Sequence, residues 1–303
     1  MGDGGSGPKS PGHCASIEAR VKLATGPLWP NTAGSLDPRL NVGRHRIPLG
    51  LLALTLAGCY TGEGSGRVAV ERFEVGEFTQ VVLSGDARVI IEPGGHAVSA
   101  SAEDDVLPSL DVAVDGGTLV LQREVDWIDG VRPTVPIEFR VTLPMLEGIR
   151  VSGRGTATVR GVKFGADAKL ASSGAASIDA GPVVCGRLVA EVDGAGEILV
   201  TGLAAAAFVG VVGGLGRITA MGTADEVDVD VSGSGLYRGS DLRGTSTRVD
   251  ASGAGQALVW AERRLDADVG GVGRVVYRGD PVIEGRGGAG VVAMDAGTEE
   301  RGG

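Results

Sequence analysis

Residues 188–235 read LVAEVDGAGEILVTGLAAAAFVGVVGGLGRITAMGTADEVDVDVSGSG, and they decide the fold because they repeat a single pattern. A Gly-x-Gly-like step returns about every 20 residues through the C-terminal half of the chain. The first glycines of the eight steps are Gly153, Gly174, Gly194, Gly214, Gly233, Gly253, Gly271 and Gly288. A unit of this length cannot bury its own apolar face, so the units must stack on one another.

When these units are aligned on the first glycine, apolar and polar side chains fall at alternate positions. Two residues before it stand Val192, Val212 and Val231, and the positions between the apolar columns carry polar residues such as Asp193 and Glu197. Alternation with a period of two indicates β-strands. The sequence therefore predicts an all-β fold, a single elongated right-handed parallel β-helix (β-solenoid) with coils of about 20 residues.

The last unit departs from this pattern. Alignment on Gly288 assigns Glu284 and Arg286 to inward columns, and it places Val292 in the apolar column that follows the glycine. Charged side chains do not belong inside a dry stack unless they are paired. We therefore interpret this unit as a capping coil.

A separate signal precedes the repeats. Residues 44–59 read RHRIPLGLLALTLAGC, a basic head followed by an apolar run that is too short to cross a bilayer. This is the layout of a cleaved secretory signal. Its end, Leu56, Ala57, Gly58 and Cys59, resembles the lipobox of bacterial lipoproteins, which implies cleavage before Cys59 and acylation of its thiol.

These signals divide the chain into segments. Residues 1–41 are predicted to be a non-native or disordered extension, with translation starting near Val42, and residues 42–58 a lipoprotein signal peptide. A linker is expected over 59–71 and the solenoid over 72–294, with irregular coils to residue 146 and repeat coils from 147. Residues 295–303 are an expected disordered tail. The protein is predicted to be exported and anchored by its lipid in the cell envelope, at the outer membrane or cell surface.

The first part of the predicted solenoid has strands without the Gly-x-Gly beat. It contains FEVGEFTQVVLSGDARVIIEPGG over residues 73–95 and VTLPML over residues 141–146, and S-G-x-G steps follow at Ser152, Ser232 and Ser252. From about Arg72 to Val292, this order resembles the bacterial envelope family described as putative auto-transporter adhesin, head GIN domain. The resemblance implies a β-helical fold and an exported protein with a role in adhesion.

Composition excludes some functions. The net charge of −10 disfavours nucleic acid as a partner, because phosphate binding needs a basic surface. No helical pattern follows the glycine steps, so they are not phosphate-binding loops, and we predict neither a cofactor nor a metal. Cys14 lies upstream of the signal peptide, which leaves Cys185 as a small buried hydrophobe rather than half of a disulfide.

An enzymatic function has little support in the sequence. A carbohydrate-active β-helix enzyme, a lyase or a hydrolase, needs clustered carboxylates, a base and aromatic platforms. His96 is the only histidine after Cys59, Trp127 and Trp260 are the only tryptophans there, and Asp104-Asp105 is predicted to be a solvated turn. We predict a non-enzymatic module with a structural role or a role in adhesion or binding, and with an unknown protein or glycan partner. The enzyme and an oligomeric scaffold remain the alternatives.

One outward column is acidic. Asp230, Asp250 and Asp268 fall on successive coils, where stacking brings like charges within roughly 5 Å of one another. Arg248, between Asp228 and Asp266 in a neighbouring column, is predicted to dilute this repulsion. A plain solvated face is the favoured interpretation of the acidic column, and a weak cation or basic-partner face is the alternative.

Overall fold

The structure is a computed structural model that describes residues 62–124, 130–285 and 290–294. The predicted extension, signal peptide, lipobox and tail lie outside the described residues, as do Cys59, Trp127, Arg286 and Gly288. The described residues form nineteen β-strands and one short 3-10 helix, η1 (Leu107–Ser109). The all-β prediction is therefore confirmed.

The strands follow one another closely along the chain. The N-terminal strands are β1 (Val68–Phe73), β2 (Gln80–Gly85), β3 (Arg88–Pro93), β4 (Ala97–Glu103), β5 (Leu110–Asp115), β6 (Thr118–Arg123) and β7 (Glu138–Leu143). The repeat strands are β8 (Met145–Gly153), β9 (Thr156–Arg160), β10 (Lys163–Gly174), β11 (Ser177–Gly181), β12 (Val184–Gly194), β13 (Glu197–Gly214), β14 (Arg217–Val231), β15 (Leu236–Ala251) and β16 (Gln256–Val269). The last strands are β17 (Arg274–Arg278), β18 (Val282–Glu284) and β19 (Val291–Ala293).

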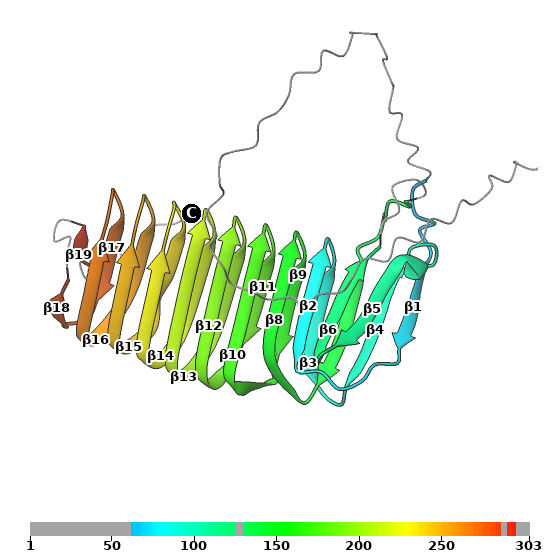
Figure 1. Cartoon of the computed structure of the whole chain (residues 1–303), viewed down its shortest axis with the longest axis horizontal. Helices are drawn as coiled ribbons and strands as arrows, with labels where there is room; N and C mark the ends of the chain where they lie inside the picture. Colours follow the sequence, from blue (N-terminus) through cyan, green and yellow to red (C-terminus); the bar gives the residue numbers. More distant parts are fainter. Residues whose placement is uncertain (1–61, 125–129, 286–289, 295–303) are drawn as a thin grey trace, which may run out of the picture. The chain divides into compact units, whose positions relative to one another are not determined.

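Each coil of the repeat region runs along one wall of the stack, turns at a Gly-x-Gly step and returns along the other (Figure 1). One wall contains β8, β10 and β12 in parallel order, and the other contains β9, β11 and the start of β13. Strand β13 belongs to both walls, because residues 197–200 pair with β11 and residues 207–214 pair with β12. The predicted parallel coils of about 20 residues are confirmed.

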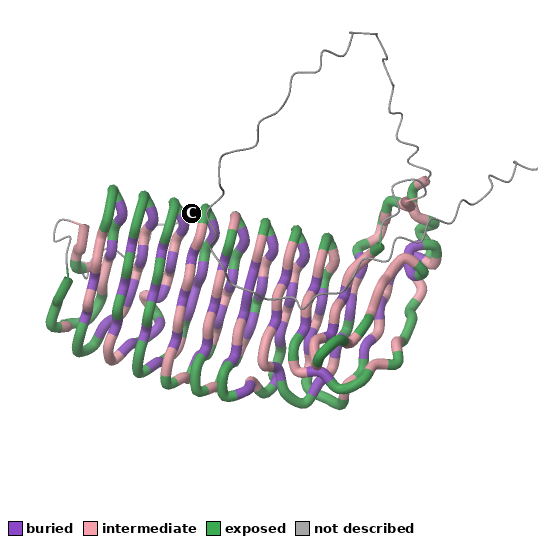
Figure 2. Tube along the Cα trace, viewed as in Figure 1, coloured by how far each residue is buried: buried purple, intermediate pink, exposed green. Residues whose placement is uncertain are grey.

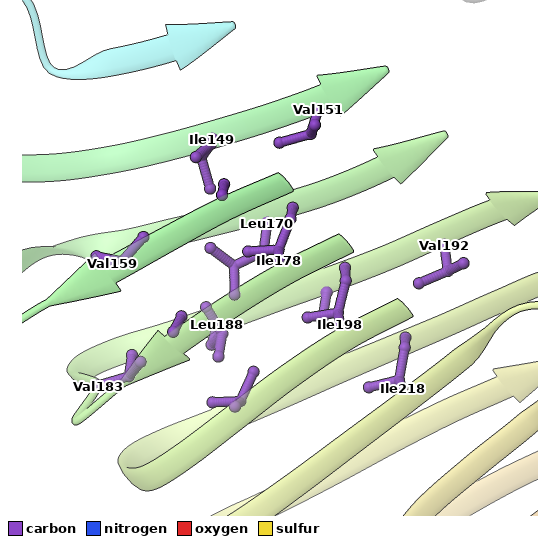
Figure 3. Close-up of a cluster of buried hydrophobic side chains, with 14 of the residues drawn as sticks. Ile149, Val151, Val159, Leu170, Ile178, Val183, Leu188, Val192, Ile198 and Ile218 are labelled. Atoms are coloured by element: carbon purple, nitrogen blue, oxygen red, sulfur yellow. The ribbon is translucent and has the colours of Figure 1, made fainter. Parts of the chain in front are cut away.

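The predicted inward columns form the core. Val192 pairs in register with Val212, and Val212 with Val231, and none of the three is more than 2% exposed. Buried positions alternate with exposed ones along each wall (Figure 2). The interior is filled by Val, Ile, Leu and Ala side chains of successive coils, as the cluster around Leu170, Ile178 and Ile198 illustrates (Figure 3). Burial of these side chains stabilises the stack by about 25 cal/mol for each Å² of apolar surface that is removed from water.

The turn glycines are required for two reasons. Gly194 and Gly214 have φ of 111° and 75°, which only glycine adopts without strain. They also stack directly, since a Cβ on Gly214 would lie 2.8 Å from the carbonyl oxygen of Gly194. The second glycine of the step has a different role, because a Cβ on Gly216 would lie 2.2 Å from a methyl carbon of Val192. The Gly-x-Gly beat is thus a requirement of close coil stacking.

The N-terminal coils are not stacked in chain order. Strand β2 lies between β6 and β8, and β3 lies between β7 and β9. The coil formed by β6 and β7 is therefore closer to the N-terminal end of the stack than the coil formed by β2 and β3, although it comes later in the sequence. Beyond it the pairing becomes antiparallel, with β5 against β6, β4 against β7 and β1 against β4. These antiparallel strands close the N-terminal end, at the blue and cyan end of the stack (Figure 1).

The prediction for the last unit is wrong by one residue. Glu284 pairs with Asp266, and Val291 rather than Val292 pairs with the buried Val275. A shift of one residue moves every side chain to the opposite face of a strand. Glu284 is therefore exposed, and its carboxylate lies 2.6 Å from Arg264 Nη2 instead of pointing inward.

Candidate functional site

A groove with a volume of about 540 Å³ lies beside the N-terminal coils. Several separate parts of the chain form its walls: the turn at residues 84–87, Leu110 of β5, the end of β6, the loop at residues 132–137 with Phe139 of β7, and Arg154 from the next coil. The ladder pairings explain this convergence, since β2 lies between β6 and β8. A cavity of this volume is within the range of small-ligand sites.

The groove is basic, whereas the whole chain is acidic. Its charged lining consists of Arg123, Arg132 and Arg154 against one carboxylate, Asp86. Arg154 Nη2 lies 2.8 Å from Asp86 Oδ2. Arg123 is held by Ser109 Oγ, 2.9 Å from its Nε, and by the carbonyl oxygen of Val131. Guanidinium groups, with their planar arrays of donors, suit a carboxylate, sulfate or phosphate group.

The groove has few of the groups that catalysis on a glycan requires. Asp86 is its one carboxylate and is ion-paired with Arg154, while the ring of Phe139 is only 1% exposed. His96 serves a structural contact elsewhere, because its Nε2 lies 3.0 Å from the carbonyl oxygen of Phe78 and its ring packs edge-on against the Phe78 ring. The groove therefore offers charge and shape to a ligand rather than an acid and a base.

The structure brings the predicted acidic column together. Asp230 pairs in register with Asp250, and Asp250 with Asp268, on the outer surface of three successive coils. Burial, with the neighbouring charges of Asp250 and Asp228, raises the pKa of Asp230 above its ordinary value. Among the described residues, no three His, Cys, Asp or Glu side chains are grouped so that they could hold a metal ion. The raised pKa of Asp230 shows that its ionised form is disfavoured beside Asp250 and Asp228.

The predicted compensating arginine is present. Arg248 lies in register between Asp228 and Asp266, and its Nη1 is 3.5 Å from Asp266 Oδ2. Similar ion pairs join neighbouring coils elsewhere on the walls, such as Lys169 with Glu191 at 2.8 Å. These pairs remain partly accessible to solvent, so each contributes little stability on its own.

Trp260 is unavailable as a platform for sugar rings. It lies in register between Arg243 and Arg278 on the neighbouring coils, and their guanidinium carbons are 4.5 and 4.3 Å from its ring centroid. Cation–π contacts of this length are favourable. Because one arginine comes from each adjacent coil, both faces of the indole are covered.

Sequence reasoning missed a cluster of contacts at the N-terminal end. Glu103, the last residue of β4, and the following Asp104 and Asp105 bind the segment formed by residues 64–67. The two aspartates are therefore more than the solvated turn that was expected. Hydrogen bonds from the Thr134 side chain, and from backbone N–H groups including those of Thr134 and Gly66, outweigh burial and lower the pKa of Glu103. We call these three acidic residues the N-terminal clasp.

The remaining cysteine is a poor nucleophile. Cys185 is half-buried, packs against the core and pairs in register with Ala205. Burial, with a smaller effect from the charge of Asp167, raises the pKa of its thiol. The expectation of a small hydrophobe at this position agrees with these contacts.

Comparison with solved structures shows the same fold in several bacterial proteins. A putative lipid binding protein from Parabacteroides distasonis matches with 21% identity, a TM-score of 0.69 and coverage of 77% of this chain and 99% of that one. A putative adhesin from the same organism matches with 20% identity and a TM-score of 0.69, over 77% of this chain and 96% of that one. A putative adhesin from Parabacteroides merdae matches with 16% identity and a TM-score of 0.70, over 76% and 95%.

The search of curated proteins gives no significant match. No helix in the described part of the chain has the length and apolar character needed to span a bilayer. A family model, in contrast, matches residues 77–281, which include the strands from β2 to β17 and all the residues that line the groove. The chain belongs to the family described as putative auto-transporter adhesin, head GIN domain.

Proposed function

We propose that this protein is a non-enzymatic, lipid-anchored adhesion module of the bacterial cell envelope that binds an anionic ligand in its N-terminal groove. The observation that carries the proposal is the reversal of charge at the groove. Three arginines and one aspartate line it, although the chain as a whole has a net charge of −10. Membership of an adhesin family supports a role at the cell surface.

Binding is favoured over catalysis by the chemistry of the lining. Arginine stays protonated in proteins, so the three guanidinium groups hold an anion but do not exchange protons with it. Asp86 is neutralised by Arg154 at 2.8 Å, and the groove brings no second carboxylate close to it. Glycoside hydrolysis ordinarily uses two carboxyl groups on either side of the scissile bond.

The anchoring part of the proposal rests on the sequence. Leu56, Ala57, Gly58 and Cys59 follow a basic head and an apolar run, in the order that precedes lipidation. Mass spectrometry of the mature protein from a bacterial membrane fraction should find an N-terminal peptide that begins at an acylated Cys59. A Cys59→Ser variant should lose the lipid and the membrane association. An unmodified peptide from residues 1–58 in the mature protein would contradict the anchor.

Ligand binding is tested with acidic and neutral polymers. Heparin and polygalacturonate should bind, dextran should not, and affinity should fall with added salt because screening weakens charge contacts. The double variant Arg132→Ala/Arg154→Ala should weaken binding at least tenfold. Arg217→Ala, on a distant coil where Arg217 is ion-paired with Glu197, is the matched control and should bind like the native protein. The groove assignment would be contradicted if dextran bound as tightly as the acidic polymers. It would also be contradicted if Arg217→Ala lost as much affinity as the double variant.

A further inference from the structure

The chain is fastened to the N-terminal end of the solenoid by the N-terminal clasp. The backbone N–H groups of Ser65 and Gly66 donate to carboxylate oxygens of Asp105 and Glu103, each at 2.9 Å. Arg67 Nη2 lies 2.9 Å from Asp104 Oδ2, and the N–H of Asp104 donates to the carbonyl oxygen of Arg67. These contacts hold the segment on several sides and lead directly into β1.

The fastening extends to Gly62. The N–H of Gly64 donates to the carbonyl oxygen of Arg132 at 2.9 Å, and the N–H of Arg132 donates to the carbonyl oxygen of Gly62 at 3.0 Å. A side chain at position 64 would collide with the Glu103 carboxylate, 2.0 Å from the Cβ position. The sequence predicts a linker over residues 59–71, whereas the structure places residues 62–71 in contacts with the clasp, with Arg132 and with β4.

The consequence is a short tether. Only Tyr60 and Thr61 separate Cys59 from Gly62. A fully extended chain spans at most about 3.6 Å per residue, so three steps reach roughly 11 Å. The headgroup layer of a bilayer is itself about 5 to 7 Å thick on each side. A lipid on Cys59 therefore keeps the clasp end of the solenoid at the membrane surface.

Strand β1 pairs with β4 along one edge of the clasp end, and it exposes both apolar and charged side chains. Val68 and Val70 are 56% and 68% exposed, and Glu71 and Arg72 are exposed as well. The interfacial region of a bilayer accepts such a mixture, because apolar side chains leave water there while the charged ends of long side chains reach the headgroups. Apolar side chains are also exposed at the other end, on β18, so the short tether decides which end lies at the membrane.

We infer that the β1 end is a base held against the lipid bilayer by the Cys59 anchor, with the solenoid axis pointing away from the membrane and β18 at the distal end. This inference rests on the proposed anchoring and adds an orientation to it. In the stack β1 lies at one end, next to β4, and β18 lies at the other end, next to β16 (Figure 1). The position of a coil between these ends therefore sets whether it is near the lipid or displayed.

The orientation is tested with fluorescent reporters on the lipidated protein. The full chain carrying Cys185→Ser is produced with its lipid and reconstituted into phosphatidylcholine vesicles that contain a headgroup-spin-labelled lipid. A bimane label is placed at Val70→Cys, at the base, or at Val272→Cys, a residue 80% exposed on a C-terminal coil. The label at position 70 should be quenched several times more strongly than the label at position 272. Equal quenching at the two positions, or none at position 70, overturns the orientation.

The tether length provides the matched control. A ten-residue Gly-Ser insertion between Tyr60 and Thr61 adds a flexible coil with an end-to-end distance of about 17 Å, and it should reduce quenching at position 70. The same insertion after Met294 should leave it unchanged. Flotation with the vesicles separates two kinds of failure. Failure to float overturns both the anchor and the orientation, whereas flotation with equal quenching overturns the orientation alone.

Discussion

The hydroxyl of Tyr237 occupies the space where a side chain at Gly239 would begin, since a Cβ on Gly239 would lie 2.4 Å from that oxygen. On the preceding coil, a Cβ on Gly210 would lie 3.4 Å from the Tyr237 ring and 3.1 Å from the Phe208 ring. Two glycines in otherwise apolar inward columns thus make room for the aromatic rings of Tyr237 and Phe208, whose centroids are 6.0 Å apart. Glycine here serves packing within the core.

Removing the Tyr237 hydroxyl should stabilise the protein. The residue is 1% exposed, burial raises the pKa of its phenol, and its oxygen has no hydrogen-bond partner in the described part of the chain. A buried polar group without a partner costs about 1 to 3 kcal/mol. Tyr237→Phe should therefore raise the free energy of unfolding by about 1 kcal/mol in urea denaturation. Tyr277→Phe, which alters a half-buried hydroxyl, is the control with little change expected. A loss of stability in Tyr237→Phe would contradict the packing described.

Substitution by alanine should destabilise the protein much more at a turn glycine than at the glycine beside it. Gly214 combines φ of 75° with a Cβ position 2.8 Å from the Gly194 carbonyl oxygen, so Gly214→Ala should lower the free energy of unfolding by about 2 kcal/mol. Gly213 has no positive φ, and its Cβ position is 3.5 Å from the closest atom outside its chain neighbours. Gly213→Ala should change stability by less than about 0.5 kcal/mol. Equal effects, measured by chemical denaturation, would argue against direct glycine stacking.

The N-terminal clasp should make stability depend on pH. The pKa of Glu103 is held below its ordinary value of 4.5, first by the Thr134 hydroxyl. The folded state thus binds a proton at Glu103 more weakly than the unfolded state does. The resulting stabilisation is fully present above pH 4.5 and is lost as the pH falls through the lowered pKa. Glu103→Gln should reduce this pH dependence in unfolding curves recorded from pH 7 to 3, whereas Glu197→Gln should retain it. If the stability of Glu103→Gln depended on pH as strongly as that of the native protein, Glu103 would not be the source of this pH dependence.

The acidic column should have the opposite effect on the pH dependence of stability. Burial and the charges of Asp250 and Asp228 raise the pKa of Asp230, so the folded state binds a proton there more tightly than the unfolded state. The column therefore lowers stability once the pH rises above the ordinary pKa of aspartate. Asp250→Asn should lower the pKa of Asp230, measured by carboxyl-carbon NMR, and increase stability at pH 7. Asp179→Asn, on the other wall, should leave the pKa of Asp230 unchanged, and an equal shift in both variants would contradict the column.

The repeat region is predictable from sequence because local and long-range requirements coincide there. Gly214 provides both the positive φ of the turn and the space for close contact with the next coil. Alignment of the units on this glycine therefore places Val212 correctly in the inward column. The last unit is different. Alignment on Gly288 matches Glu284 with Ala267 and Val292 with Val275. In the structure Glu284 pairs with Asp266, and Val291 pairs with Val275, so the two strands that flank this step are each displaced by one residue in opposite directions. A repeat pattern with one fixed spacing does not predict such a change in the length of the turn.

The N-terminal coils and the groove were beyond this kind of prediction. Alternation identifies strands such as β4 and β6, but it does not specify whether they pair in parallel or antiparallel, or which coil comes first. The groove joins Asp86, Arg123 and Arg132 through those same pairings. The clasp had one visible signal, three consecutive acidic residues at 103–105 beside a strand end, and its partners at 64–67 are almost forty residues away.

Stacking in register is the claim on which the groove, the clasp and the orientation all depend. Glu197 and Arg217 pair across adjacent coils, whereas Glu197 and Leu236 are two coils apart, at about 9.6 Å for a strand spacing of 4.8 Å. In a background without the native cysteines, Glu197→Cys/Arg217→Cys should form an intramolecular disulfide under mild oxidation, because that bond requires Cα atoms closer than about 7 Å. Glu197→Cys/Leu236→Cys should not. Failure of the first pair to crosslink, or equal yields from both pairs, would contradict the stacked-coil architecture.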